Sequence, residues 1–323
     1  MLYYSGLLNI EGVKPDLLVG VADIATASQV GLDQEEINPS QVRSVLEANG
    51  VDFSPRVIAF ASLKGGTGKT TSSVTTAVRA VDYGFRPCLL DLDSQGSASL
   101  ALGVVPKDDD DVFVDVWQNP SESLPRALIE HSSGISLLPS SLDNSLLDVQ
   151  LVNPSAQKSA VREVCSTVTR ERYDLVVIDC PPSLGTAVIS TICAADVIVI
   201  PTNSDRFSLK AVELTIQEIN AICETFGLIS PSIRVLYTKF DKRLRLAHDT
   251  LEFLSARYPA ELISPPIRTS SEYAKQLEVQ KTVFAGRKKS VAREDYDHLV
   301  RELLGVKAKI ADDSPVDMRS GVF

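Results

Sequence analysis

Short runs of apolar residues alternate with longer amphipathic stretches over most of the chain. Continuous apolar runs are typical of strands buried on both faces of a sheet, whereas apolar residues that recur every three or four positions are typical of helices. The pattern therefore predicts an α/β fold, with a mainly parallel sheet covered by helices on both faces. The expected strands are 57–62, 87–92, 135–139, the apolar part of 173–182, 196–201 and 233–238.

The expected helices lie between and after these strands. A helix over 70–83 ends at Gly84, because glycine readily adopts the left-handed backbone that closes helices. In 156–172, valines at positions 161, 164 and 168 repeat at helical spacing. Further helices are expected at 208–226 and in three pieces between 246 and 304, with loops near 265–266 and 285–290.

The N-terminal residues contain two helix-like pieces, 22–29 and 40–49, closed by glycines. They are compatible with a helix-turn-helix, in which Gln41, Arg43 and Ser44 would face a DNA groove, or with a small helical docking module. We expect an N-terminal helical extension over 1–55, an α/β domain over 56–305 and a flexible tail over 306–323.

Composition and charge narrow the class of protein. Hydrophobic residues at 44% and charged residues at 23% are ordinary for a folded globular chain. The sequence has no apolar run long enough to span a membrane and no signal peptide, so we expect a cytoplasmic protein with no membrane partner. The net charge of −10 argues against a simple cationic nucleic-acid binder. The charge is uneven, however, because 234–301 holds 14 basic and 9 acidic residues, an excess of 14 − 9 = +5.

The segment 63–71 reads Leu-Lys-Gly-Gly-Thr-Gly-Lys-Thr-Thr and lies between an expected strand and an expected helix. This order of elements is typical of a phosphate-binding loop, in which glycines let backbone N–H groups reach phosphate oxygens. The helix N-terminus and Lys69 add positive charge, and the hydroxyl of Thr70 is suited to Mg²⁺. The expected nucleotide-binding residues here are Lys64, Gly65, Gly66, Thr67, Gly68, Lys69, Thr70 and Thr71. The usual pattern has glycine where this chain has Leu63, and a second lysine, Lys64, opens the loop.

Carboxylates follow two of the expected strands. Asp91 and Asp93 stand at the end of 87–92, and Asp179 ends the apolar run of 173–182. Ligands of open α/β sheets bind at the carboxyl ends of the strands, so these side chains are candidates for catalysis. We interpret Asp179 as a Walker B aspartate that supports Mg²⁺ opposite Thr70. The alternative for the first pair is a capped surface loop.

Basic residues are spread through the C-terminal region: Arg268, Lys275, Lys281, Arg287, Lys288, Lys289 and Arg293. They are candidates for contacts with the DNA backbone, and the alternative is an ordinary solvated face. Aromatic residues are sparse there, so recognition of single strands is not supported.

The chain resembles the ParA family of partition ATPases, within the ParA/MinD group of deviant-Walker P-loop proteins. The resemblance extends over roughly 57–304. It rests on Lys-Gly-Gly-Thr-Gly-Lys-Thr-Thr at 64–71, Asp-Leu-Asp-Ser-Gln-Gly at 91–96, Val-Ile-Asp-Cys-Pro-Pro at 177–182, Pro-Thr at 201–202 with Asp205 and Ser-Leu at 208–209, and Tyr-Thr-Lys-Phe-Asp at 237–241.

The resemblance implies roles for particular residues. Lys64 would cross the interface of an ATP-bound sandwich dimer to reach the partner's phosphates and, with Lys69, serve catalysis. Asp93 would orient or activate the attacking water, and Asp91, Asp179 and Thr70 would support the metal. Thr238 and the residues around Asp241 match the strand end that faces adenine.

The function implied is that of a slow, Mg²⁺-dependent ATPase for DNA segregation. ATP would drive dimerisation and non-specific DNA binding on the nucleoid, and a ParB-like centromere-binding protein would stimulate hydrolysis. A MinD- or FlhG-like membrane-cycling ATPase is the first alternative, but it needs a basic amphipathic C-terminal helix that 306–323 does not offer. The second is an iron-sulfur reductase on the same scaffold. It needs cysteines that bridge a cluster, and the five cysteines are scattered, with Cys180 beside the Walker B motif.

Overall fold

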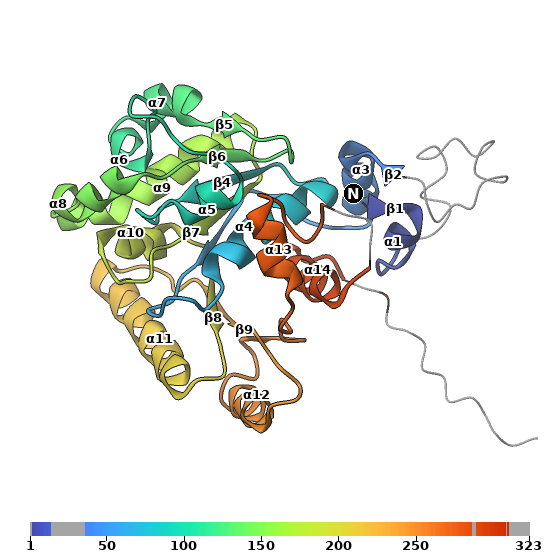
Figure 1. The fold of residues 1–323 in the computed structure, drawn as a ribbon. Helices are drawn as coiled ribbons and strands as arrows, with labels where there is room; N and C mark the ends of the chain where they lie inside the picture. Colours follow the sequence, from blue (N-terminus) through green and yellow to red (C-terminus); the bar gives the residue numbers. More distant parts are fainter. Residues whose placement is uncertain (1, 14–35, 286–288, 308, 310–323) are drawn as a thin grey trace, which may run out of the picture.

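A single large sheet runs through the computed structural model, which describes residues 2–13, 36–285, 289–307 and 309 (Figure 1). In this described part the sheet has eight strands in the order β10-β9-β8-β3-β7-β4-β6-β5, and all neighbours are parallel except β5 and β6. The strands are β3 (Arg56–Phe60), β4 (Pro87–Asp91), β5 (Ile129–Glu130), β6 (Ser136–Leu138), β7 (Leu175–Asp179), β8 (Val197–Thr202), β9 (Ser232–Tyr237) and β10 (Leu262–Ile263). The predicted mainly parallel sheet is confirmed.

Helices cover both faces of the sheet. They are α4 (Lys69–Asp82), α5 (Ser97–Ala101), α6 (Phe113–Val116), α7 (Pro120–Ala127), α8 (Leu147–Gln150), α9 (Pro154–Glu171), α10 (Thr186–Ala194), α11 (Arg206–Phe226), α12 (Arg245–Arg257), α13 (Glu272–Glu278) and α14 (Val291–Leu304), with a 3₁₀ turn, η3 (Leu142–Leu146). Because side chains alternate along a strand, Ile58 and Phe60 pack toward α4 and α14, while Val57 and Ala59 pack toward α9, α10 and α11. The sheet therefore separates two hydrophobic cores.

Most expected elements are present within one or two residues of their predicted ends. The helix α10 was not predicted, because it is apolar on nearly all sides and has no polar stripe that would reveal a helical period. The short helices α6 and α7 lie in a segment whose polar composition favours a loop. Phe113 is fully buried there, so this segment also contributes to the core.

The N-terminal residues pack on the face that carries α4 and α14. β1 (Leu2–Tyr3) pairs with β2 (Glu36–Ile37), followed by α1 (Tyr4–Leu8) and α3 (Pro39–Ala48) respectively. The expected helix 40–49 is confirmed as α3, and the expected helix 22–29 lies outside the described residues. Leu7 and Val42 belong to the same core as α4 and α14. The division of the chain at 55 and 305 stays a prediction.

Residues 9–11 are hydrogen-bonded to residues 307 and 309 beside these N-terminal elements. The backbone N–H of Glu11 donates to the carbonyl of Lys307, and that of Lys309 donates to the carbonyl of Asn9, both at 2.9 Å. Val306 is buried in the same core. The residues that follow α14 are thus tied to those that follow α1.

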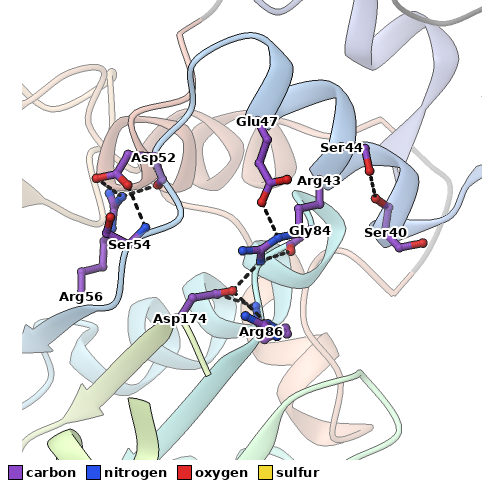
Figure 2. A network of polar contacts seen from close by, with 10 residues as sticks. All are labelled: Ser40, Arg43, Ser44, Glu47, Asp52, Ser54, Arg56, Gly84, Arg86 and Asp174. Atoms are coloured by element: carbon purple, nitrogen blue, oxygen red, sulfur yellow. Dashed lines mark hydrogen bonds and ion pairs between the residues drawn. The ribbon is translucent and has the colours of Figure 1, made fainter. Parts of the chain in front are cut away.

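An ion-pair network fastens α3 to the sheet (Figure 2). The guanidinium of Arg43 donates to the carboxylate of Asp174 at 2.5 Å and to the carbonyl of Gly84 at 3.1 Å, and it lies over the ring of Phe53 at 4.1 Å. Gly84 has a left-handed backbone, and a Cβ there would lie 2.6 Å from the Cβ of Arg43, so glycine both ends α4 and admits α3.

This docking bears on the helix-turn-helix hypothesis. Arg43 points toward the sheet. Gln41 accepts a hydrogen bond from the backbone of Asn38, and Ser44 donates to the carbonyl of Ser40. In this arrangement Arg43 is engaged by the protein itself, and the helix-turn-helix hypothesis stays untested.

Candidate functional site

The glycine-rich loop connects β3 to α4 at the carboxyl end of the central strand. Gly66 and Gly68 have left-handed φ angles of 71° and 94°, which other residues rarely adopt. Lys69 is 7% exposed, and its ammonium donates to the carbonyl of Lys64 at 3.1 Å. Burial lowers the pKa of Lys69, while the nearby Asp179 opposes that shift. The backbone turn and a buried cation thus meet at one place, as phosphate binding requires.

The end of β9 braces this loop from the side. The hydroxyl of Thr238 donates to the carbonyl of Thr67 at 2.7 Å, and the ammonium of Lys239 donates to the carbonyl of Gly66 at 2.8 Å. Lys239 has a left-handed φ of 54°. The sequence assigned Thr238 to the strand end that faces adenine and gave no role to Lys239, the next residue of the same 237–241 segment.

Asp241 follows Thr238 and Lys239 in the chain. Its carboxylate accepts two hydrogen bonds from the guanidinium of Arg243, at 2.9 and 2.6 Å, which lower the pKa of Asp241 to about 2. The expected contact of Asp241 with adenine stays a prediction.

Lys64 is held within its own chain. Its ammonium forms an ion pair with Asp205 and donates to the hydroxyl of Ser208 at 3.0 Å. Asp205 is the N-cap of α11, and its carboxylate also accepts from the backbone N–H of Ser208. Burial pushes the pKa of Asp205 upward, but the hydrogen bonds from Lys64 and Ser208 outweigh it and lower the pKa. Because the side chains of Lys64 and Asp205 remain 31% and 42% exposed, water competes for this pair and keeps it weak.

Two buried carboxylates face the loop from neighbouring strands. Asp91 ends β4 and Asp179 ends β7, paired in register. The backbone N–H and hydroxyl of Ser99 donate to Asp91 at 2.8 Å, and the hydroxyl of Thr70 donates to Asp179 at 2.7 Å. Burial raises the pKa of both side chains, to about 6 for Asp91 and about 8 for Asp179, and repulsion from Asp91 adds to the rise at Asp179.

The residues present fit a magnesium ion. One carboxylate oxygen of Asp179, Oδ1, is buried with no hydrogen-bond partner among the described residues, and such an oxygen is costly to bury unless a cation meets it. The described residues contain no group of three or more His, Cys, Asp or Glu that could hold a metal. Mg²⁺ suits such a site, because it is usually held by one or two carboxylates together with phosphates and water. Thr70, Asp91 and Asp179 would be its protein partners.

Asp93 is more accessible than these carboxylates. It is half-buried, its backbone N–H donates to Asp91 at 3.2 Å, and its carboxylate accepts from the backbone of Gln95 at 3.0 Å. It lies on the loop after β4, at the same edge of the sheet as the glycine-rich loop. The catalytic role implied for Asp93 stays a prediction.

The candidate DNA-binding residues differ in their surroundings. Arg268 is engaged by the buried Asp295 at 2.5 Å, so a contact with DNA would require this ion pair to open. Lys275, Lys281 and Lys289 are exposed, whereas Arg287 and Lys288 lie outside the described residues. The guanidinium of Arg293 donates to the carbonyl of Val283.

All five cysteines are buried as free thiols. Burial and the neighbouring Asp179 raise the pKa of Cys180 to about 12. A thiol with so high a pKa is a poor source of the thiolate that metal clusters need. Cys180 is therefore a core residue in this structure.

The fold and this site define a class of protein: P-loop nucleoside triphosphatases whose glycine-rich loop carries an additional lysine. The AAA domain family AAA_31 matches residues 55–234. The chain belongs to this family and, through its relatives, to the ParA/MinD superfamily.

Similar proteins agree with this assignment. The cell division protein PomZ of Myxococcus xanthus is 28% identical over 267 residues, which cover 82% of each chain. The chromosome partitioning protein ParA of the same organism is 27% identical over 255 residues, 77% of this chain and 88% of that one. An ATP complex of a McdA variant from Cyanothece has a TM-score of 0.70 at 21% identity, over 80% of this chain and 99% of that one. This last likeness concerns the fold alone.

Proposed function

We propose that the protein is an ATP-dependent partition ATPase that works as a molecular switch. ATP binds at the glycine-rich loop, the bound form dimerises and attaches to DNA without sequence preference, and hydrolysis releases it. The family supports the ATPase. Dimerisation, DNA binding at the nucleoid, a cytoplasmic location and a ParB-like partner that stimulates hydrolysis are parts of this proposal.

The observation that carries the proposal is the position of Lys64. Its side chain lies at the edge of the phosphate-binding loop, partly exposed and paired with Asp205. A lysine supplied by a second subunit would stabilise charge on the transferred phosphoryl group, so hydrolysis would depend on dimerisation. Lys64 would first have to leave Asp205, and an exposed ion pair of this kind breaks at little cost.

The protein groups around the loop account for the remaining steps. Backbone N–H groups of 65–69 and the ammonium of Lys69 would bind the phosphates, and Asp93 would orient the attacking water. Mg²⁺ held beside Thr70 and Asp179 would neutralise charge on the phosphates. Thr238 and Lys239 keep the loop in shape through its carbonyls.

The test compares two lysines of one loop. Lys69→Ala should abolish ATP binding, measured with a fluorescent ATP analogue, because it removes the buried phosphate cation. Lys64→Ala should still bind the analogue but lose dimerisation with ATP, measured by light scattering, and lose hydrolysis by about 10³-fold, as for a cation supplied from a partner. A Lys64→Ala protein with full ATPase activity would rule out the role of the second subunit.

DNA binding has its own test. Retention on duplex DNA at moderate salt should require ATP and should weaken when Lys275, Lys281 and Lys289 are changed to glutamate, because each removes a phosphate contact. Lys107→Glu and Lys242→Glu, exposed lysines on other elements, are matched controls. Retention that resists the triple change would place the DNA surface elsewhere. The described residues contain no helix that could cross a membrane, and no described feature favours the membrane-cycling alternative.

A further inference from the structure

A groove of about 230 Å³ lies beside the loop that carries Asp93. One wall is formed by 94–96 together with Ser99 and Leu100, and the other walls are formed by 104–106 and 140–142. None of the roles described above uses this groove. The groove lies between the Asp93 loop and residues of α5 and η3.

The groove is apolar and open. Leu100, Val105 and Leu142 line it and are 53%, 70% and 70% exposed. Leu146, the last residue of η3, is also 49% exposed. Gathered exposed apolar side chains rimmed by polar ones are typical of a surface that another protein covers.

The rim of the groove is mainly acidic, because charged residues follow two of the segments that line it. Lys107 and then Asp108, Asp109 and Asp110 follow Pro106, and Asp143 follows Leu142; the four aspartates are exposed. No salt bridge joins any of them to a cation in the described part of the chain. Lys107 is the only basic residue between positions 93 and 125. An acidic rim repels DNA phosphates and attracts lysine and arginine side chains.

The floor of the groove is bonded to the Asp93 loop. The hydroxyl of Ser140 donates to the carbonyl of Asp93 at 2.7 Å, and the backbone N–H of Ser140 donates to the hydroxyl oxygen of Ser99 at 3.1 Å. Gly96 has a left-handed φ of 60°, and a Cβ there would lie 2.9 Å from the carbonyl oxygen of Ser140. A segment that fills the groove would therefore press on the loop that positions Asp93.

We propose that this groove docks a segment of a partner protein in which leucine or valine side chains alternate with lysine or arginine, and that docking changes the hydrolysis rate through the Asp93 loop. The apolar walls bind the aliphatic side chains, and the acidic rim binds the cations. The rate effect rests on the proposed ATPase function, whereas the docking itself does not.

The test selects ligands without assuming a partner. A displayed library of random 15-residue peptides is panned against the full-length protein with ATP and Mg²⁺. Enriched peptides are then synthesised with a fluorescent label, and their binding is followed by anisotropy. Panning should enrich peptides that contain both aliphatic and basic residues, and their binding should weaken with added salt.

Variants locate the binding site. Val105→Asp with Leu142→Asp should weaken binding by at least about tenfold, because two apolar anchors are lost. Asp108→Lys with Asp109→Lys should weaken it less and reduce its salt dependence. Ile229→Asp, a residue 98% exposed between α11 and β9, is the matched control and should leave binding unchanged. Circular dichroism confirms that each variant is folded.

The outcomes of these experiments distinguish the groove proposal from the proposed ATPase function. Enriched peptides that bind the Val105→Asp/Leu142→Asp protein normally, or that lack basic residues, overturn the groove proposal. So does a change in self-association of that variant without a change in peptide binding, which would assign the groove to a second copy of the chain. Peptides that bind the groove of a protein without measurable ATPase activity support the docking and contradict the ATPase function instead.

Discussion

Strand β7 carries a buried carboxylate at each end, and the two have opposite surroundings. Asp174, directly before the strand, receives Arg43 at 2.5 Å, Arg86 at 3.0 Å and the backbone N–H of Arg86 at 2.7 Å. Asp179, at the last residue, receives the hydroxyl of Thr70 and keeps one oxygen without a partner among the described residues. The Asp174 carboxylate is paired within the chain, whereas one oxygen of Asp179 is available to a ligand.

A carboxylate that serves stability and a carboxylate suited to function thus stand at opposite ends of β7. The buried Asp174 carboxylate holds α3, β4 and β7 together, and its loss removes the anion that Arg43, Arg86 and the backbone N–H of Arg86 share. The buried Asp179 carboxyl, which has one oxygen without a partner among the described residues, holds its proton tightly in the metal-free protein and gains most when a metal arrives. Three substitutions test this contrast and a fourth tests the Lys64–Asp205 pair, from the largest expected effect to the smallest.

Asp174→Ala should reduce the free energy of unfolding by about 3 to 5 kcal/mol, the typical cost of removing one partner of a buried ion pair. Urea unfolding followed by circular dichroism measures it. Glu47→Ala, which removes an exposed partner of Arg43, should cost less than about 0.5 kcal/mol. Equal losses from both substitutions would mean that Asp174 is no more than a surface contact.

Arg43→Met should cost about 2 kcal/mol, because it keeps the aliphatic part of the side chain and removes a hydrogen bond to a buried charge. The loss is smaller than for Asp174→Ala, since Arg86 still pairs with Asp174. The same urea experiment applies. Nucleotide affinity should stay unchanged, because the pair lies at the opposite end of β7 from the glycine-rich loop, and a loss of affinity would contradict this separation.

Asp179→Asn should act in the opposite direction and stabilise the metal-free protein by about 1 kcal/mol at pH 8. A carboxyl whose pKa is raised by folding holds its proton more tightly in the folded state, so its contribution to stability is present below the ordinary carboxyl pKa and is lost as pH rises through the raised value. Melting temperatures without metal should therefore fall less between pH 5 and pH 8 in Asp179→Asn than in the parent. Stabilisation by Mg²⁺ with ATP should disappear in the variant, and its persistence would move the metal away from Asp179.

Asp205→Asn should have the smallest effect on stability, within about 1 kcal/mol, because the Lys64–Asp205 pair is partly exposed. It frees the Lys64 ammonium from an anionic partner without removing it. If dimerisation needs Lys64 released, the ATP concentration at half-dimerisation should drop a few-fold, measured by light scattering. A rise in that concentration would mean that Asp205 positions Lys64 for the partner.

The carboxyl-terminal edge of the sheet could be predicted from the sequence far better than its amino-terminal edge. Glycine spacing, the lysines and the aspartates at strand ends are local patterns. The positions of the glycine-rich loop, Asp91 and Asp179 at one edge of the sheet could therefore be predicted. Asp174 begins the same apolar run that Asp179 ends, yet its role depends on Arg43, which is 131 positions away in sequence. Gly84 was assigned as a helix end, and nothing local in the sequence indicates that α3 packs against it.

The backbone bonds between the two ends of the described chain bear on how much of it folds alone. The family match stops at residue 234, but α14 lies beyond it and anchors the end of α4, since Asp297 accepts from both Arg79 and Tyr83 at 2.8 Å. α14 in turn shares its core with Leu7 and Val306. We therefore expect a protein trimmed to the family domain to expose the apolar side of α4, the helix that follows the glycine-rich loop.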